Sequence, residues 1–591
     1  MSSPHSITVP EGFTLHKENT SHILLPSSND AFLNPVQEFN RDLSVACIRT
    51  WSDLADTEKE KKWRLAQERR AKKAVGGPKS KRPKNDDVTS APLPPAEHVA
   101  EESATIPTDE VRESGTPAEV EKFASGSQKQ PEYRRQTFVI LEALSATGLR
   151  SIRYAKEIPL VKYVIANDIS PAAAAAMRRN VELNNLGGQE TSSEEGSAES
   201  QTTAEGSKPI LPKVRVNEGD ACALMYNHRV ERQRVDVVDL DPYGTAAPFI
   251  DAAVQCVNDG GLLCVTCTDL SVLATTNFPE KCFSNYGGVP VKAEYCHESA
   301  LRLVLHTIAT SAARYGRYMQ PMLSLSIDFY VRLFVRVHTG ANEVKKILSK
   351  SSMYYVCSGC QSFYSQPLGR MTEQVHEASG NVNLHFKIRA GPTAPDRCPE
   401  CNSVFHISGP MWSGAIHDTD FVSKVLTHVE ANEDNYGTSA RMKGMLTVAK
   451  EELDTPFYFT PAKVAGNFHC TCPSLDEVAS ALVNAGHQIS RSHACAGSLK
   501  TTATRADIHD VFRSWVKTHP VRMDKVAENS PTRHLLSKEP KAEANFKHHP
   551  DSLTPSSKVK LVRYQQNPTP NWGPGTKAGP GKRKRGQDDG E

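Results

Sequence analysis

Short apolar runs that alternate with helix-like stretches and polar turns constrain this chain most strongly. Between residues 137 and 266 each run has the length and composition of a buried strand. Strands that alternate with helices form a parallel sheet covered on both faces. We therefore predict an α/β domain with a mostly parallel, doubly wound sheet over residues 134–340. The predicted strands are Thr137–Leu141, Val161–Ala166, Val214–Val216, Val235–Val238 and Leu262–Thr266, closed by a helix near 298–315 and strands near 323–338.

The fourth run leads directly into the hexapeptide Asp239–Gly244, of sequence DLDPYG. Strands in an open α/β sheet end at the ligand crevice, so we expect Asp241 and Tyr243 to lie there. A carboxylate that accepts N–H bonds from the exocyclic amine of a nucleobase activates a poor nucleophile. An aromatic ring holds the base by stacking, worth roughly 1–3 kcal/mol. An Asx-Pro turn after an ordinary strand is the alternative.

The segments upstream favour a ligand site over a plain turn. Residues 142–151 (EALSATGLRS) form a small-residue turn entering a helix, where a nucleoside can approach the backbone, although the full G-x-G-x-x-G pattern is absent. Asp168 ends the second strand and is placed to bind ribose hydroxyls. Asp220 ends the third strand, where it suits contacts to an adenine edge. Turn, helix, strand and acid in this order predict a nucleoside cofactor.

Two Cys-x-x-Cys pairs, separated by the 37 residues 361–397, mark the second half of the chain. Four thiolates from two such pairs fit tetrahedral zinc with no open position, which indicates a structural site. Two reduced surface pairs are the alternative, and a redox pair is disfavoured because neither follows a strand into a helix. Further His and Cys between residues 469 and 495 have poor ligand spacing, and we expect no metal there. The predicted zinc ligands are Cys357, Cys360, Cys398 and Cys401.

The remaining segments differ in composition from these domains. Residues 1–52 contain a helix from Val36, with Arg41 near its buried edge, and we assign them to the catalytic domain. Residues 53–133 are an insertion, predicted to begin as a charged helix and to continue as a disordered Pro- and Ser-rich stretch. Residues 187–212 are a second insertion, predicted to be disordered. Residues 526–591 are predicted to be a disordered basic tail, ending in a cluster at 581–585 suited to nuclear import or RNA contact.

The composition of the whole chain narrows its class. No run of about 18 apolar residues is present, so we expect no membrane association. The 14 cysteines are few for 591 residues, and several stand singly in apolar runs, which favours a reduced intracellular protein. We expect a monomer in the nucleus, and the sequence leaves a mitochondrial pool open.

Together these stretches resemble one family, the S-adenosylmethionine-dependent tRNA guanine-26 N2-dimethyltransferases. The resemblance implies a class I, Rossmann-like methyltransferase domain followed by a smaller zinc-containing α+β domain, residues 341–525, that binds tRNA. It covers nearly all of the chain outside 53–133, 187–212 and the tail. The matching motifs are NPVQEFNRDLSV, LEALSATGLRSIRYA, ANDIS, GDA, DLDPYG, PFYFT and SRSHACAGSLKT.

The resemblance also implies roles for individual residues. Asp241 is the expected acceptor or base, and Pro242 offers its backbone carbonyl. Phe32 and Tyr243 resemble the aromatic pair that encloses guanine, whereas Leu33 stands where the family often has another aromatic residue. The residues expected to contact S-adenosylmethionine are Arg41, Arg150, Asp168, Asp220 and Ala221. The residues expected on a tRNA-facing surface, with a merely solvated face as the alternative, are Arg491, Lys500, Arg505 and Lys517.

The expected activity is methyl transfer from S-adenosylmethionine to the exocyclic N2 of a guanine in tRNA. A second transfer would give dimethylguanosine, and the sequence does not decide between one and two. A DNA or rRNA amino-methyltransferase is an alternative, because Asp-Pro-aromatic suits other exocyclic amines. An inactive zinc-ribbon RNA-binding scaffold is another alternative, and Asp168, Asp241 and Arg150 argue against it.

Overall fold

The computed structural model describes residues 7–27, 33–75, 132–188, 211–377 and 380–558. The chain divides into two compact units. Residues 1–55 and 136–591 form the first unit, and residues 56–135 form the second. The predicted boundary at residue 340 therefore lies inside the first unit, and the division there into two domains stays a prediction.

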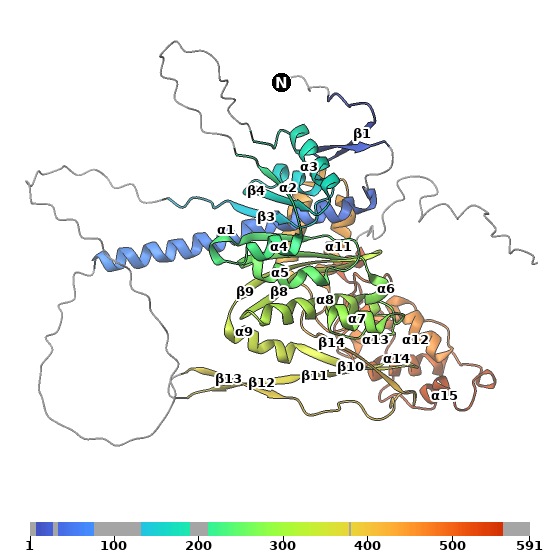
Figure 1. Ribbon diagram of the computed structural model, residues 1–591. Coiled ribbons are helices and arrows are strands. Elements are labelled where there is room, and N and C mark those ends of the chain that lie inside the picture. The colour runs from blue at the N-terminus through green and yellow to red at the C-terminus, as the bar shows by residue number, and fades with distance from the viewer. Residues whose placement is uncertain (1–6, 28–32, 76–131, 189–210, 378–379, 559–591) are drawn as a thin grey trace, which may run out of the picture. The chain divides into compact units, whose positions relative to one another are not determined.

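A seven-stranded sheet forms the centre of the first unit (Figure 1). Its order is β5-β4-β3-β6-β7-β9-β8; the first five strands in that order are parallel, and β9 is antiparallel to both of its neighbours. This confirms the predicted mostly parallel sheet. The chain order reverses between β3 and β6, which is where such sheets open a ligand crevice. The strands are β3 (Phe138–Glu142), β4 (Val161–Asp168), β5 (Val214–Glu218), β6 (Val235–Leu240), β7 (Val257–Cys267), β8 (Arg317–Ile327) and β9 (Tyr330–Thr339).

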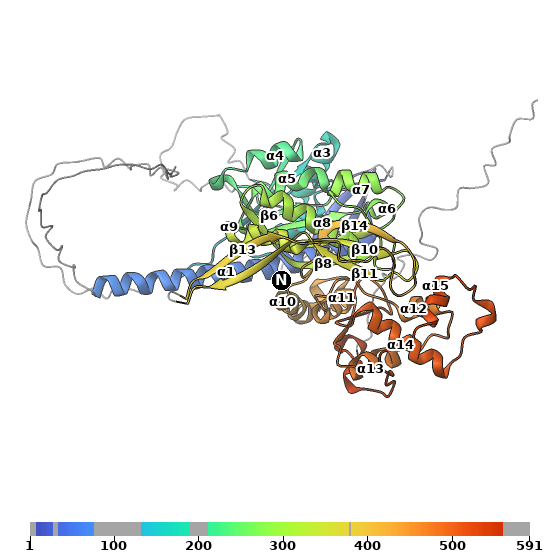
Figure 2. The ribbon, with the colours of Figure 1, turned by 90° about the horizontal axis from the view of Figure 1, so that it is seen from below.

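Helices cover both faces of the sheet. Successive residues of a strand point to opposite faces, and here the residues on both faces are apolar, so both must be buried. Along β7, Leu263, Val265 and Cys267 belong to one buried cluster, and Leu262 and Cys264 belong to another. Figure 2 shows α4 and α5 on one side of the sheet and α10 and α11 on the other. The first face is covered by α4 (Ala221–Asn227), α5 (Ala247–Cys256), α6 (Leu270–Leu273), α7 (Pro279–Tyr286) and α8 (Cys296–Ala313). The second face is covered by the start of α1 (Glu38–Val75), α2 (Leu149–Glu157), α3 (Pro171–Leu183), α10 (Thr419–Ala431) and α11 (Ser439–Glu451).

The N-terminal helix is longer than predicted. A hairpin of β1 (Phe13–Glu18) and β2 (Ser21–Pro26) precedes the turn η1 (Pro35–Gln37), and α1 then continues without a break as far as Val75. The charged first part of the predicted insertion is therefore helical. In the second unit, Asp56 accepts hydrogen bonds from Tyr133 Oη at 2.8 Å and from Arg135 Nε at 2.9 Å. Residues 76–131 and 189–210 lie outside the described residues.

The C-terminal part combines small sheets with helices. A three-stranded sheet has the order β11-β10-β14, and the 37 residues between the two cysteine pairs supply β11 and the ribbon β12–β13. The strands are β10 (Ser351–Cys357), β11 (Phe363–Pro367), β12 (Gly369–Val375), β13 (Val382–Ile388), β14 (Phe405–Trp412), β15 (Ile489–Arg491) and β16 (Leu499–Thr501). The helices are α9 (Ala341–Lys346), α12 (Pro461–Phe468), α13 (Leu475–Asn484), α14 (Arg505–Thr518) and α15 (Pro531–Leu536).

The prediction that the chain is disordered from residue 526 onward is wrong as far as residue 558. Helix α15 lies in this segment, and Leu535 packs with Phe468 and Phe512 in a buried cluster. Further on, Ser556 donates a backbone hydrogen bond of 2.8 Å to Glu451. Alternating apolar periodicity is weak in this polar stretch, which explains why its few anchoring residues were missed. The basic cluster at 581–585 lies outside the described residues.

A buried polar network links the C-terminal part to the sheet. Glu452 accepts a 2.6 Å hydrogen bond from His493 Nδ1, and His493 Nε2 in turn accepts the N–H of Ser326 on β8 at 3.1 Å. Lys500 Nζ lies 3.3 Å from Glu452 and 3.4 Å from Glu298 on α8. Burial raises the pKa of the Glu452 carboxyl, but His493 and Lys500 outweigh it and hold that pKa well below its usual value.

This network corrects part of the predicted tRNA-facing surface. Lys500 is fully buried, and Arg505 is buried with its guanidinium donating to the carbonyl of Tyr458 at 2.9 Å. Neither side chain is accessible to RNA. Lys517 is exposed but lies 2.8 Å from Glu539 and 2.7 Å from Glu543, so its charge is balanced locally.

Removing the buried cation should destabilise the protein strongly. Lys500→Met would leave the carboxylates of Glu452 and Glu298 without the ammonium between them, and we expect a loss of about 3 kcal/mol in the free energy of unfolding. Urea unfolding followed by circular dichroism measures this loss. Lys463→Met, on the exposed side of α12, is the matched control and should change stability by less than about 0.5 kcal/mol. Equal effects of the two substitutions would contradict a structural role for Lys500.

Candidate functional site

A cavity of about 280 Å³ lies at the carboxyl ends of β3, β4 and β6. Its wall also includes the loop before α2 and the first turn of α1. It is therefore at the reversal point of the strand order, where the sheet topology places a ligand. Six of the predicted site residues line it: Arg41, Arg150, Asp168, Asp241, Pro242 and Tyr243.

The loop between β3 and α2 has a conformation that brings its backbone to the cavity. Ala146 has φ 46° and Gly148 has φ 77°, both in the left-handed region. A Cβ on Gly148 would also lie 3.1 Å from the side chain of Met177 on α3, so glycine is required there. Asp168 holds the loop by accepting the N–H of Ala146 at 2.9 Å. The acid at the end of β4 thus shapes the wall and also presents a carboxylate to the cavity.

Arg150, in the first turn of α2, is ion-paired with Asp241. Its Nη1 donates to the hydroxyl of Ser44 at 3.1 Å, and its Nε lies 3.6 Å from Glu142. The side chain is almost fully buried, so these interactions are screened little by water. The acid at the strand end therefore has a fixed cationic partner in the absence of any ligand.

The two acids of the DLDPYG motif have different environments. Asp239 is completely buried, and both its oxygens bind Arg332 on β9, at 2.8 and 3.1 Å. Burial raises the pKa of Asp239, but Arg332 and Arg150 outweigh burial and lower it below its usual value. Asp239 is thus part of the interior, and Asp241 is the acid that reaches the cavity.

Glu142 at the end of β3 also lines the cavity, and we had not predicted it as a site residue. It accepts hydrogen bonds from the hydroxyls of Ser145, at 2.9 Å, and Ser151. Burial raises its pKa to about 7, although Arg150 and Ser151 oppose the rise. A nearby cation therefore stabilises the charged form of Glu142. Its place in the EALSATG turn was the available signal in the sequence.

Tyr243 is exposed to 76% at the mouth of the cavity, next to the buried Pro242. The following residue, Gly244, donates its N–H to the hydroxyl of Thr268 at 2.8 Å, which fixes the end of the hexapeptide against β7. An exposed ring on an anchored turn is suited to stacking on a base. Phe32, the predicted second ring, lies outside the described residues.

Arg41 lines the cavity from α1 but is also held by β1. Its Nε donates to Glu18 at 2.7 Å, and Glu18 binds Arg153 at 2.8 Å as well. Asp220 and Ala221 are not part of the cavity wall. The Asp220 carboxylate instead caps α4 by accepting the N–H of Ala223 at 2.7 Å. The predicted cofactor contacts of Asp220 and Ala221 stay predictions.

The four predicted metal ligands come together. Sγ of Cys357 lies 3.3 Å from Sγ of Cys401, and Sγ of Cys360 lies 3.6 Å from Sγ of Cys398. All four are buried, none forms a disulfide, and their sulfur atoms lie within 4.8 Å of one another. Four sulfurs at about 2.3 Å from a central zinc have a similar mutual spacing, roughly 3.8 Å. The geometry therefore fits a tetrahedral thiolate site.

A second group, His417, Glu452 and His493, is also compact enough to hold a metal ion. Both ring nitrogens of His493 are already used in hydrogen bonds, and His417 Nδ1 accepts the N–H of Ser324 at 3.3 Å. This group is therefore a hydrogen-bond network. His493 is the member of the 469–495 stretch that belongs to this group, and the absence of a metal from that stretch stays a prediction.

The sequence is similar to one family over most of its length. A family model described as N2,N2-dimethylguanosine tRNA methyltransferase matches residues 12–513. The tRNA (guanine(26)-N(2))-dimethyltransferase of Schizosaccharomyces pombe is 40% identical over 96% of this chain and 92% of its own length. The mouse protein of the same name is 39% identical over 97% of this chain and 78% of its own length.

A solved structure has the same fold. The complex of Trm1 from Pyrococcus horikoshii with S-adenosyl-L-methionine aligns with a TM-score of 0.55 at 22% sequence identity. The alignment covers 86% of this chain and 99% of the other. The C-terminal sheets and helices are thus part of a shared architecture. No helix among the described residues is long and apolar enough to cross a bilayer.

The raised pKa of Glu142 predicts a pH-dependent effect of its replacement. The pKa of this carboxyl rises from 4.5 to about 7 on folding. Above pH 7 this lowers the free energy of unfolding by about 3 kcal/mol, and below pH 4.5, where the folded and unfolded states are both protonated, it has no effect. Glu142→Gln keeps an acceptor for the two serines. Relative to wild type, we expect it to gain stability as pH rises from about 4.5 to 7, with little difference below. Urea unfolding at pH 5 and pH 8 tests this, and a difference independent of pH would contradict it.

Proposed function

The chain belongs to the N2,N2-dimethylguanosine tRNA methyltransferase family, and on that basis we propose how its cavity performs the family's reaction. It transfers methyl groups from S-adenosylmethionine to the exocyclic N2 of guanine 26 in tRNA, twice in succession. The observation that carries this assignment is the arrangement of Asp241 and Tyr243 at the mouth of a cavity with cationic and anionic walls. A catalytic acid lies there beside a ring that can hold a base.

The residues of the inner wall suit S-adenosylmethionine. When bound, this cofactor supplies a methyl group activated by a cationic sulfur. Arg41 and Arg150 offer guanidiniums to a carboxylate, and Asp168 offers an acceptor to ribose hydroxyls. Glu142, with its raised pKa, gains from a neighbouring positive charge. A cationic cofactor would therefore stabilise the charged form of this carboxyl.

The residues of the mouth suit a guanine that has left its stack. N2 is not accessible to the enzyme inside a helix, so the base must turn outward. Tyr243 stacks on one face of the base, and we assign the opposite face to Phe32. Asp241 and the carbonyl of Pro242 accept the two N2–H bonds. These contacts orient the nitrogen lone pair toward the methyl group and exclude water.

The ion pair with Arg150 sets what Asp241 can do. The guanidinium holds the carboxylate in position, and the carboxylate oxygens still accept hydrogen bonds. As the bond from N2 to the methyl carbon forms and the carbon–sulfur bond of the sulfonium breaks, the positive charge passes to N2, where Asp241 would stabilise it and take the released proton. The driving force comes from the cofactor, so the residues of this chain act by orientation and electrostatics.

The four-cysteine site is proposed to hold a structural zinc ion with no open position. Glu400, between the two cysteines of the second pair, binds Arg513 at 2.6 Å and His509 Nδ1 at 3.3 Å, both on α14. The metal would therefore fasten the start of β11 and the end of β10 to the C-terminal helices. Catalysis is not assigned to it, because the cavity lies at the edge of the other sheet.

Two further expectations stay proposals. The basic cluster at 581–585 is proposed to direct the protein to the nucleus; it lies outside the described residues, as does most of the insertion. A monomer is also proposed. A mitochondrial pool is left open.

Loss of the Asp241 carboxylate should reduce turnover far more than RNA binding. We expect Asp241→Ala to lower kcat by a factor of about 10²–10⁴, and tRNA affinity by less than about threefold. Nucleoside mass spectrometry of tRNA incubated with S-adenosylmethionine measures the first, and filter binding the second. Asp454→Asn, an exposed acid outside the cavity, is the control.

Each other outcome changes a separate part of the proposal. Equal losses of turnover and tRNA binding would remove the catalytic assignment of Asp241. Monomethylguanosine without dimethylguanosine would reject the second transfer. Wild-type activity on tRNA with adenine at position 26 would reject the site of modification.

Metal removal tests the thiolate site. We expect about one zinc ion per chain by elemental analysis, and we expect Cys398→Ser to lose it and to lower Tm by several degrees. Cys472→Ser is the control, because Cys472 is exposed and lies outside the four-cysteine group. Zinc-free protein with unchanged Tm would contradict the proposal.

A further inference from the structure

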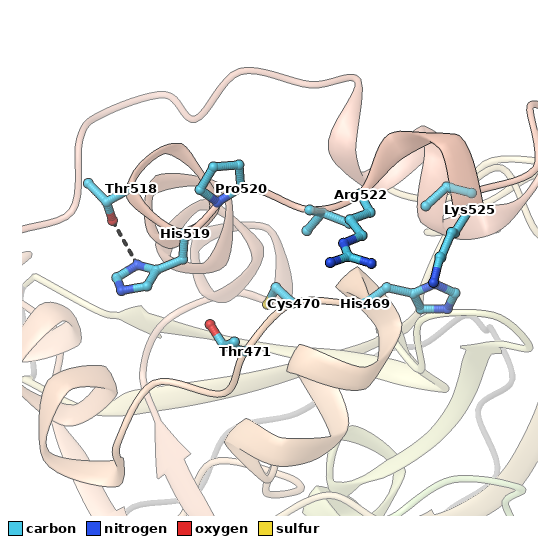
Figure 3. Close-up of a pocket in the computed structure, with 10 residues that line it drawn as sticks. His469, Cys470, Thr471, Thr518, His519, Pro520, Arg522 and Lys525 are labelled. Atoms are coloured by element: carbon cyan, nitrogen blue, oxygen red, sulfur yellow. Dashed lines mark hydrogen bonds between the residues drawn. The ribbon is translucent and has the colours of Figure 1, made fainter.

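A second hollow, of about 570 Å³, lies in the C-terminal part and shares no residue with the cavity at the sheet edge. It lies between the end of α12, the end of α14 and the turn η5 (Met523–Lys525). Figure 3 shows Thr518 and His519 on one side, Arg522 and Lys525 on the other, and Thr471 between them. Two segments of chain, residues 469–471 and 518–526, thus converge on one space.

The wall of this hollow is positively charged, although Asp524 lies between its two cations in the sequence. Its wall contains Arg522, Lys525, His469 and His519, and no carboxylate. Arg522 and Lys525 are exposed, and no acidic group within the described ranges pairs with either. Lys517, on the same helix as His519, differs because it lies within 2.8 Å of two glutamates. Unpaired cations around a concave surface indicate an anionic ligand.

The wall that carries these groups is fixed. The His519 ring stacks on Trp515 at a centroid distance of 3.8 Å, and the indole N–H of Trp515 donates to the carbonyl of Thr471 at 2.9 Å. His469 ends α12 in the left-handed region, with φ 54°, which directs the chain into the hollow. Because stacking and hydrogen bonds already hold this part of the wall, few of its side chains lose conformational entropy when a ligand binds, so the entropic cost of binding is small.

The ends of the two helices do not oppose an anion strongly. Both α12 and α14 present their carboxyl ends here, where unpaired carbonyls carry partial negative charge. Gly466 and Ala465 accept the N–H groups of His469, at 3.2 Å, and Cys470, at 3.1 Å, and Trp515 accepts that of His519 at 3.0 Å. Much of that partial charge is therefore satisfied within the chain.

We propose that this hollow binds backbone phosphates of the RNA substrate, as a contact remote from the methylated base. The inference rests on the proposed function, because that function supplies a polyanion to a protein with a net charge of only +2. Arg522 and Lys525 carry the formal charges, so the hollow accommodates at most two phosphates. The hydroxyl of Thr471, which accepts the indole N–H of Trp515 at 3.3 Å, keeps its own proton to donate to their oxygens.

Charge removal in the full-length protein tests the proposal. In the double variant Arg522→Gln/Lys525→Gln we expect the Kd for an unmodified tRNA transcript to rise on the order of tenfold near 0.1 M salt. The slope of log K against log salt should fall by about 1.4–1.8, the contribution of two phosphates. At saturating tRNA kcat should be unchanged, as should the Kd for S-adenosylmethionine. Filter binding over a salt series and steady-state kinetics provide these values.

A matched variant controls for loss of charge alone. Lys162→Gln/Arg232→Gln removes one lysine and one arginine, both exposed, at the edge of the sheet opposite the cavity. It should leave the salt slope within about 0.3 of wild type. An equal fall in both double variants, or an unchanged slope in the Arg522/Lys525 variant, would overturn the proposal. The proposal would also be overturned if inorganic phosphate bound wild type but not the Arg522/Lys525 variant while the two proteins had the same affinity for tRNA.

The proposed function can fail independently of this inference. Wild type that makes no methylated guanosine but loses tRNA affinity in the Arg522/Lys525 variant would reject the reaction and keep the contact. Wild type that makes dimethylguanosine, with a variant that binds tRNA normally, would keep the reaction and reject the contact.

Discussion

The guanidinium of Arg150 lies among carboxylates from two strands: Asp239 and Asp241 at the end of β6 and Glu142 at the end of β3. It also binds Ser44 on α1. One buried cation therefore connects the two strands at which the sheet reverses its order with α1 and α2, which cover the same face. Without it, three acids would lie close together in a poorly solvated space, and one or more would take up a proton. The cavity, the position of Asp241 and the start of α2 all depend on this interaction.

The C-terminal part depends on similar compensation. Glu298 and Glu452 are buried far from each other in sequence and share Lys500. Glu400 connects the cysteine site to α14 through Arg513. In each case a buried acid from one segment meets a cation from another, so the segments cannot separate without exposing unpaired charge. These pairs explain why residues 341–558 pack as one unit with the sheet.

Sequence reasoning predicted the features that local pattern determines. Buried strands with β-branched residues, the DLDPYG turn and the spacing of the cysteine pairs each follow from a few adjacent positions. The position of Lys500 could not be predicted in this way, because its burial depends on partners at 298 and 452. Glu142 was missed for a similar reason: its raised pKa arises from burial among groups of α2. Asp220 caps α4, and a helix cap and a ligand contact have the same sequence signal, so its cofactor contact stays a prediction.

The pairing of Asp241 with Arg150 has a consequence for how a nucleic acid approaches. A bare carboxylate at the mouth of the cavity would repel the phosphates on either side of the target base. With the guanidinium beside it, the mouth is close to electrically neutral at rest, and a polyanion meets no barrier there. The lone pairs of Asp241 that Arg150 does not engage can still accept hydrogen bonds from a partner that carries N–H groups. The ion pair therefore opposes the approach of phosphates less than a lone carboxylate would, and it leaves oxygen atoms that can accept the N–H groups of an amine.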